Sequence, residues 1–179
     1  MSKNVLVLSS SPRRGGNSDL LCDQFVRGAQ EAGHQTEKVF LKDLKINYCT
    51  GCGVCVEGKK RCPQKDDMAV VLDKIVAADV IAMATSVYFY TMCAQMKALI
   101  DRTCSRYTEI KNKEFYFIVT AAVSDRQELE RTVEGFRGFT SCLDGAKEKG
   151  VIYGTSAWNI GDIKAGEAMK HAHDMGKAV

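Results

Sequence analysis

The chain alternates between short apolar runs and longer amphipathic stretches, and this alternation predicts its secondary structure. The apolar runs predict strands over residues 4–9, 36–41, 79–85, 114–121 and 150–154. The stretches between them predict helices over residues 17–32, 67–77, 93–106, 126–149 and 163–177. In the first of these helices, apolar residues recur with a period of roughly 3.6 residues and form one apolar face: Leu20, Leu21, Phe25, Val26 and Ala29.

The order of these segments predicts an α/β fold. The runs around Val5, Val80 and Phe117 are almost continuously apolar, as expected for parallel strands that helices cover on both faces. A succession of about five strand–helix units predicts a doubly wound sheet of five parallel strands with helices on both faces. Because the 179 residues contain no internal repeat or convincing linker, we expect residues 1–179 to form one domain.

The composition argues against several classes of function. Hydrophobic residues make up 45% of the chain and charged residues 26%, which is ordinary for a globular protein. The net charge of +3 is small and dispersed, so we expect no nucleic-acid partner. No stretch approaches the ~20 apolar residues of a membrane span, and the N-terminus lacks the layout of a secretory signal. We therefore expect a cytoplasmic protein with no membrane partner, whose eight cysteines are mostly reduced.

The segment SSSPRRGGNS, which follows the first predicted strand, is rich in groups that bind anions. Ser9 and Ser11 offer hydroxyls, Arg13 offers a guanidinium, and the paired glycines let the backbone approach a ligand closely. Asn17 or Ser18 is expected to cap the helix that follows. Ligands of such sheets lie beyond the carboxyl ends of the strands, where a helix N-terminus attracts phosphate. The segment lacks both GxGxxG and GxxxxGK[ST], so it predicts a mononucleotide-like phosphate, with an ordinary capped turn as the alternative.

Aromatic residues follow the third predicted strand. Tyr88, Phe89 and Tyr90 come directly after it and before a helix. A planar ring can lie against such a loop, with backbone groups at its edge and an aromatic side chain over one face. Together with the hydroxyl-rich segment, this loop predicts a ligand with a phosphate tail and a flat ring. The alternative is that the three side chains pack in the core or in a subunit interface.

Two motifs resemble those of a known family. The first combines Ser11-Pro12-Arg13, Gly16-Asn17-Ser18 and Leu21, and the second combines Val87-Tyr88-Phe89, Ala94-Gln95-Met96-Lys97 and Ile100-Asp101-Arg102. On these motifs the chain resembles the flavodoxin-like NADPH-dependent FMN reductases, including the iron-sulfur flavoprotein branch, from the first strand through about Arg102. Ser86 stands where members of the family commonly have proline, which removes a rigid ring from the loop and adds a backbone donor.

The resemblance implies an FMN site made from three loops. It implies that the phosphate is held by Ser9, Ser11, Arg13, Gly16, Asn17 and Ser18. It implies that the isoalloxazine ring is held by Thr85, Ser86, Val87, Tyr88, Phe89 and Tyr90, with Thr120, Ala121 and Ala122 closing the site. The helix after the second motif often forms a dimer interface in the family, so a homodimer or homotetramer is expected.

A cysteine-rich loop at residues 47–65 is the third chemical signal. Its sequence CTGCGVCVEGKKRCP places Cys49, Cys52 and Cys55 at two successive C-x2-C steps, and Cys62 follows before a proline. This run resembles that of bacterial ferredoxins, although its last spacing is longer. The resemblance to iron-sulfur flavoproteins implies that these four thiolates hold a [4Fe-4S] cluster. A zinc ion, or no metal at all, remains open as an alternative.

The other cysteines and the single tryptophan are expected to be structural. Cys22, Cys93, Cys104 and Cys142 lie at scattered positions in predicted helices, where small buried side chains are the usual role for cysteine. Trp158 lies in a late loop bounded by glycines, and we expect it to pack against the protein, with covering of the flavin as the alternative.

The predicted function is that of an FMN-dependent oxidoreductase. NAD(P)H is the expected electron donor, and a quinone, free flavin or similar small molecule is the expected acceptor, with a ferredoxin-type protein as a partner if the cluster is present. Hydride transfer to flavin requires no protein acid or base, so no catalytic residue is assigned. Two alternatives remain: a non-enzymatic electron carrier like flavodoxin, and a redox or metal sensor based on the cysteine loop. Flavodoxins are usually acidic, whereas this chain has a pI near 8.4.

Overall fold

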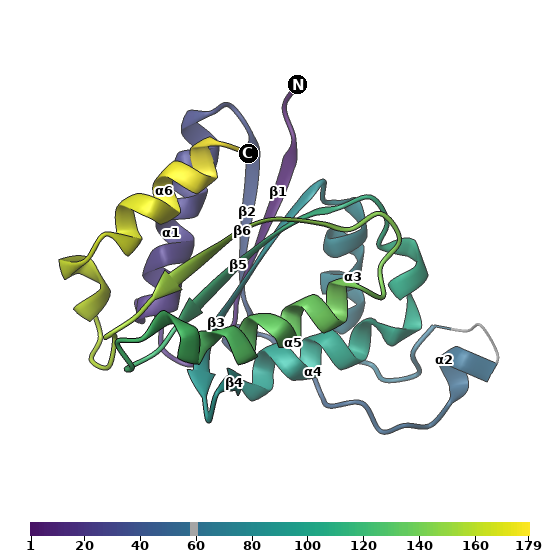
Figure 1. The fold of residues 1–179 in the computed structure, drawn as a ribbon. Coiled ribbons are helices and arrows are strands. Elements are labelled where there is room, and N and C mark those ends of the chain that lie inside the picture. Colours follow the sequence, from purple (N-terminus) through teal and green to yellow (C-terminus); the bar gives the residue numbers. More distant parts are fainter. Residues whose placement is uncertain (58–60) are drawn as a thin grey trace.

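The computed structural model describes residues 1–57 and 61–179 and contains one central sheet (Figure 1). Its strands are β1 (Asn4–Ser9), β2 (Gln35–Phe40), β3 (Val80–Tyr88), β5 (Glu114–Thr120) and β6 (Lys147–Gly154), in the order β2-β1-β3-β5-β6. All neighbours in this order pair in parallel. The short strand β4 (Thr91–Met92) pairs antiparallel with the end of β3 and was not expected. The predicted α/β fold with a parallel sheet is confirmed.

Helices cover both faces of the sheet (Figure 1). Helices α1 (Asn17–Glu31) and α6 (Ala168–Lys177) pack against each other on one face. Helices α3 (Met68–Ala77), α4 (Ala94–Arg102) and α5 (Glu130–Thr140) lie on the other face, and the short α2 (Val54–Glu57) lies on a loop away from the sheet. Within the described parts of the chain, no helix is both long enough and apolar enough to cross a membrane.

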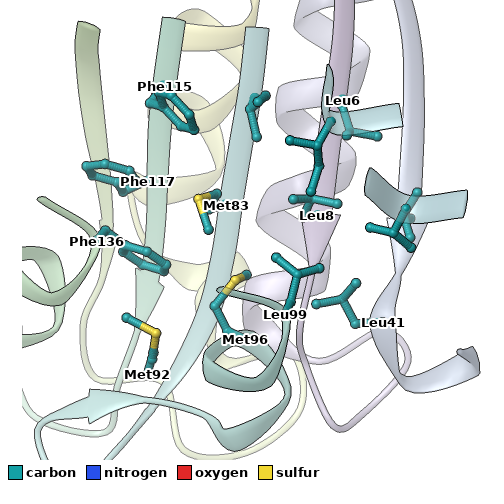
Figure 2. Packing of buried hydrophobic residues seen from close by; sticks show 14 of the residues in the cluster. Leu6, Leu8, Leu41, Met83, Met92, Met96, Leu99, Phe115, Phe117 and Phe136 are labelled. Carbon is teal, nitrogen blue, oxygen red and sulfur yellow. The ribbon is translucent and has the colours of Figure 1, made fainter. Parts of the chain in front are cut away.

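The core consists of two apolar layers, one on each face of the sheet. Along β1, Val5 and Val7 point into the layer under α1 and α6, whereas Leu6 and Leu8 point into the layer under α3, α4 and α5. Figure 2 shows the second layer, in which the ring of Phe117 from β5 stacks on a phenylalanine ring from α5, with 5.0 Å between ring centroids. Because successive side chains of a strand face opposite sides, both sides must be apolar, which explains the continuous apolar runs.

Three predicted boundaries are wrong near the C-terminus. The helix expected over residues 126–149 begins as a 3-10 helix at Arg126–Leu129 and ends as α5 at Thr140. Strand β6 then begins at Lys147, earlier than expected, and its first residues are charged and exposed. These residues lie on an edge strand and have no apolar pattern, so the sequence pattern predicts that they continue the preceding helix. The helix expected from residue 163 begins as α6 only at Ala168, after a 3-10 turn at Asp162–Ala165.

Candidate functional site

A cavity of about 410 Å³ lies at the carboxyl ends of β1, β3 and β5. From β1 the chain continues to β2 on one side of the sheet, whereas from β3 it continues to β5 on the other side. Parallel sheets of this type bind ligands at the point between two such strands. Eleven of the fifteen residues predicted to bind the cofactor line the cavity: Ser11, Arg13, Gly16, Asn17, Ser86, Val87, Tyr88, Phe89, Thr120, Ala121 and Ala122. The structure therefore brings the three predicted loops together around one hollow.

The loop after β1 is folded tightly around Gly16. The hydroxyl of Ser11 donates to the carbonyl oxygen of Arg13 at 2.7 Å and accepts from the backbone N–H of the same residue at 3.2 Å. A Cβ atom on Gly16 would lie 2.7 Å from the Ser11 hydroxyl oxygen and 2.8 Å from the Arg13 carbonyl oxygen, so only glycine fits. The Arg13 side chain remains exposed at the cavity wall.

Helix α1 begins at this loop with its first backbone N–H groups directed toward the loop end. Gly16 occupies the N-cap position, and within the described residues no side chain hydrogen-bonds to the helix start as a cap. The expected capping by Asn17 or Ser18 is therefore wrong. The first N–H groups of a helix have no partner inside the helix, and together with its dipole they favour an anion.

The carboxylate of Asp19 holds the loop after β1 in place, a role that the sequence pattern did not predict. Its carboxylate accepts hydrogen bonds from the Gly15 N–H at 2.9 Å, the Ser9 hydroxyl at 2.9 Å and the Lys38 ammonium at 3.0 Å. Burial acts to raise the pKa of Asp19, but these three donors hold it below its ordinary value. Ser9 is fully buried and does not line the cavity, so its hydroxyl supports the loop through Asp19.

Asn17 connects the start of α1 to a distant loop. Its side-chain oxygen accepts from the backbone N–H groups of Gly161 at 3.0 Å and Ile163 at 3.4 Å. Its side-chain nitrogen donates to the carbonyl oxygen of Asn159 at 2.8 Å. Asn17 thus lines the cavity, but its amide is occupied in holding residues 159–163. Ser18 is fully buried, and its hydroxyl lies 3.4 Å from that of Ser86.

The aromatic residues form a hairpin, because β3 continues to Tyr88 and turns back into β4. The turn consists of Phe89 and Tyr90, both with positive φ, at 49° and 63°. Non-glycine residues adopt this conformation at a cost of about 1 kcal/mol or more each, which is typical of functional loops. Phe89 and Tyr88 line the cavity, whereas Tyr90 lies outside the lining, 5.4 Å from the Arg131 guanidinium.

Thr85 has a structural role beneath the hairpin. Its side chain is fully buried and outside the cavity lining. The hydroxyl donates to the carbonyl oxygen of Ser86 at 2.9 Å and accepts from the backbone N–H of Cys93 at 3.0 Å. It therefore fixes the strand end to the start of α4.

Three lining residues were not expected. Ala157, Trp158 and Ile160 come from the loop after β6, which runs beside the end of β5. The Ala157 N–H donates to the Ala121 carbonyl oxygen at 2.8 Å, which places the two segments side by side. Trp158 is exposed at the cavity, so the expected packing against the protein is wrong, and the alternative that it covers the flavin stays a prediction. The only sequence signal was a lone tryptophan in a loop bounded by glycines.

The cavity lining has a polar part and an apolar part. Ser11, Arg13 and the α1 N-terminus form the polar part, and Val87, Phe89 and Trp158 belong to the apolar part. Among the described lining residues, Arg13 carries the one formal charge. A positive charge, a free helix N-terminus and a glycine at the point of closest approach fit a phosphate, and the apolar part fits a flat ring. The cavity thus suits the group that the resemblance implies.

The four cysteines of the predicted metal site lie on a loop outside this cavity. Cys49 and Cys52 are exposed, and Cys55 and Cys62 are partly buried. Residues 58–60 of this loop lie outside the described residues. Within the described part of the chain, no three histidine, cysteine or acidic side chains are arranged as a metal site. The thiols have the right chemistry for iron or zinc, but binding requires the loop to close around the metal.

A buried ion pair ties the ends of the cysteine loop to helix α4. Arg102 donates to both carboxylate oxygens of Asp66, at 2.6 and 2.9 Å, and to the Asn47 carbonyl oxygen at 2.7 Å. The side chains of Arg102 and Asp66 are 2% and 0% exposed, respectively. Burial acts to raise the pKa of Asp66, but the hydrogen bonds from Arg102 hold it below its ordinary value. Arg102 also donates to the Gln64 side-chain oxygen at 3.3 Å.

Two cysteines expected to be buried are exposed: Cys104 and Cys142. The predicted helices that contained them end at Arg102 and Thr140, so both residues lie in the turns that follow. Cys22 and Cys93 are buried, as predicted. Burial, together with the neighbouring Cys104 thiol, raises the pKa of the Cys55 thiol.

Comparison with known proteins places this site in a family. The sequence profile of the NADPH-dependent FMN reductases matches residues 3–146. An iron-sulfur flavoprotein of Archaeoglobus fulgidus is 40% identical over 92 residues, which cover 51% of this chain and 41% of that protein. One of Methanocaldococcus jannaschii is 40% identical over 99 residues, which cover 55% of this chain and 51% of that protein. The solved structure of an NAD(P)H:quinone oxidoreductase from Methanothermobacter marburgensis has a TM-score of 0.73 at 18% identity, covering 99% of this chain and 96% of that one.

The fold and the meeting of three strand-end loops define an α/β protein of the flavodoxin-like class. The profile match extends over most of the chain, so the protein belongs to the NADPH-dependent FMN reductase family. The resemblance found in the two motifs is confirmed. The family and the flavoprotein relatives support FMN as the cofactor. The chain spans about half the length of the curated relatives that it matches.

Proposed function

We propose that the protein is an oxidoreductase that uses FMN to transfer electrons from NAD(P)H to a small acceptor. The observation that carries this proposal is the cavity at the ends of β1, β3 and β5, with its positive polar part and its apolar part. In the reaction with a quinone, NAD(P)H gives up a hydride. The quinone takes up two electrons and two protons, one of them from solvent, and leaves as the hydroquinone.

Each part of the cavity has a defined task in this proposal. The α1 N-terminus and Arg13 bind the phosphate of FMN, Ser11 lines the site and holds the loop in shape through Arg13, and the absence of a side chain on Gly16 lets the backbone reach the phosphate. The hairpin residues Ser86–Phe89 and the strand end at residues 120–122 hold the isoalloxazine ring. FMN supplies the redox chemistry by accepting a hydride and passing electrons on. Among the described lining residues, none has a carboxylate, imidazole or thiol, so we assign no protein acid or base.

We also propose that Cys49, Cys52, Cys55 and Cys62 hold a [4Fe-4S] cluster. The support is their donor chemistry, the anchoring of the loop by Arg102 and the two iron-sulfur flavoproteins among the relatives. Such a cluster would supply one-electron transfer, with a ferredoxin-type protein as partner. A zinc ion is the alternative occupant. Iron, sulfide and zinc analysis of protein purified without oxygen distinguishes the two.

Two neighbouring arginines provide a sharp test of the FMN site. Arg13 lines the cavity, whereas Arg14 pairs with Asp43 and lies over the Phe40 ring at 4.6 Å. A charge-assisted hydrogen bond contributes about 1.5–3 kcal/mol, so Arg13→Ala should weaken FMN binding about 10- to 100-fold. Arg14→Ala should leave it nearly unchanged. The measurement is a titration of FMN-free protein, followed by flavin fluorescence.

The outcomes separate the candidate functions. Wild-type protein that fails to bind FMN contradicts the proposal as a whole, and equal effects of the two arginine variants contradict the placement of the phosphate. Bound FMN without NAD(P)H oxidation in the presence of a quinone favours the alternative of an electron carrier. Sedimentation of the FMN-loaded protein tests the proposed homodimer or homotetramer. The cytoplasmic location stays a prediction.

A further inference from the structure

The apolar part of the cavity carries exposed aromatic rings from two separate loops. The Trp158 side chain is 72% exposed and that of Phe89 is 97% exposed, yet both line the same cavity. Trp158 comes from the loop after β6, and Phe89 comes from the hairpin after β3. Exposed large apolar side chains beside a hollow mark a surface that binds another apolar group.

The backbone that carries Trp158 is fixed, although its ring is in solvent. The Asp162 carboxylate accepts the backbone N–H groups of Trp158 at 3.0 Å and Asn159 at 2.6 Å. Asn17 binds the same loop from the other side through three hydrogen bonds to its backbone. At the end of the loop, the Ile163 side chain is buried in the core under α1 and α6. A loop held by five side-chain hydrogen bonds to its backbone presents its aromatic side chain from a fixed backbone position, as expected of a binding residue on a preorganised loop.

We infer that Trp158 is a specificity-determining residue: its ring packs against planar aromatic electron acceptors, and Asp162 is the residue that positions it. This inference rests on the proposed function, since it concerns the acceptor that enters beside bound FMN. The side chains available at this part of the cavity are apolar or aromatic, so they favour a flat ring system by stacking and by burial of area. They offer no charged group to a small inorganic oxidant, which can take electrons without contacting Trp158.

The test compares two acceptors in the FMN-loaded protein. We expect Trp158→Ala to raise KM for a naphthoquinone about tenfold, the factor that corresponds to loss of one aromatic packing contact. Trp158→Phe should retain most of the affinity. In both variants the rate with ferricyanide, a non-planar inorganic acceptor, should change less per bound FMN than the rate with the naphthoquinone. Tyr107→Ala removes another exposed aromatic ring, outside the cavity lining, and is the matched control.

The role of Asp162 is tested with a conservative pair. Asp162→Ala removes the acceptor of the two loop N–H groups, so it should raise KM for the naphthoquinone while kcat with ferricyanide stays the same. Asp162→Asn keeps a side-chain oxygen and should restore KM. Because Trp158 is the single tryptophan, its fluorescence gives a readout independent of turnover. Fluorescence anisotropy should fall in Asp162→Ala as the loop becomes mobile, and should recover in Asp162→Asn.

Three results would overturn the inference. They are an unchanged naphthoquinone KM in Trp158→Ala, an equal loss with naphthoquinone and ferricyanide, or unchanged anisotropy in Asp162→Ala. Failure of the proposed function itself gives a different result: wild-type protein would then bind no FMN, or would reduce neither acceptor with NADPH. Added FMN should also quench the Trp158 emission of FMN-free protein, which places the ring beside the cofactor without any assay of activity.

Discussion

The buried pair of Arg102 and Asp66 should contribute strongly to stability. In Arg102→Met, the Asp66 carboxylate loses two hydrogen bonds from the guanidinium and stays in a site where it is 0% exposed. Removal of one partner from a buried pair costs about 3–5 kcal/mol. For a chain of this size, each kcal/mol lowers Tm by about 2–4 °C, so we expect a fall of roughly 6–20 °C.

Two further variants separate the charge from the rest of the change. Asp66→Asn introduced into Arg102→Met removes the lone charge and keeps an oxygen for one of the two N–H groups, of Asn47 and Met68, that bond to different oxygens of the Asp66 carboxylate, so it should recover part of the lost Tm. Lys170→Met breaks an exposed pair with Asp174 on α6 and should leave Tm nearly unchanged. Calorimetry or thermal unfolding followed by circular dichroism measures all four proteins.

The difference in stability between wild type and Arg102→Met should depend on pH in a defined direction. The pKa of Asp66 is lowered in the folded state, so its contribution is present above the pKa of the unfolded chain, about 3.9, and is lost as the pH falls through the folded-state value. The difference in unfolding free energy between wild type and Arg102→Met should therefore be constant near neutral pH and shrink below about pH 4. A loss of stability in Arg102→Met no larger than that in Lys170→Met would refute the reasoning.

Two other predictions concern packing and the cysteine loop. Gly28→Ala should lower Tm, because a Cβ atom there would collide with the His173 carbonyl oxygen. Gly138→Ala places its Cβ in open space on α5 and should stabilise the fold by about 0.5–1 kcal/mol. Thermal unfolding measures both variants, and an unchanged Tm in Gly28→Ala would show that α1 and α6 can separate freely. Cys62→Ser should reduce the iron bound after anaerobic reconstitution, whereas Cys142→Ser, in the turn after α5, should not. Equal iron contents in the two variants would argue against a four-cysteine cluster.

The fold was predictable where local patterns decide it. The continuous apolar runs at β1, β3 and β5 arise because each of these strands is covered on both faces, and all three were predicted. The start of β6 was missed because Lys147 and Glu148 lie at an exposed edge, where neither side of the strand needs to be apolar. What places them in a strand is pairing with β5, including an irregular register at Phe115 and Tyr116, and that pairing leaves no local pattern.

The location of the candidate site was predictable for a different reason. Chain segments that leave the carboxyl ends of neighbouring parallel strands must meet, so the polar loop after β1 and the aromatic loop after β3 could be placed together from their order alone. The position of Trp158 at the cavity could not be predicted, because it depends on hydrogen bonds between Asn17 and residues that lie 142 to 146 positions further along the chain. No spacing or composition signals such a contact.

The roles of individual polar residues followed from partners that the sequence does not reveal. Ser9 ends β1, Thr85 lies near the end of β3 and Asn17 begins α1. Each was predicted to contact the cofactor, yet each has its side chain hydrogen-bonded to protein groups. Buried polar atoms require partners, so side chains close to a polar ligand are often used first to hold the loops that surround it. In this cavity the backbone N–H groups of α1 and the exposed Arg13 are left for the ligand. A polar cluster at strand ends therefore predicts the position of a cavity more reliably than which side chains are free to bind a ligand in it.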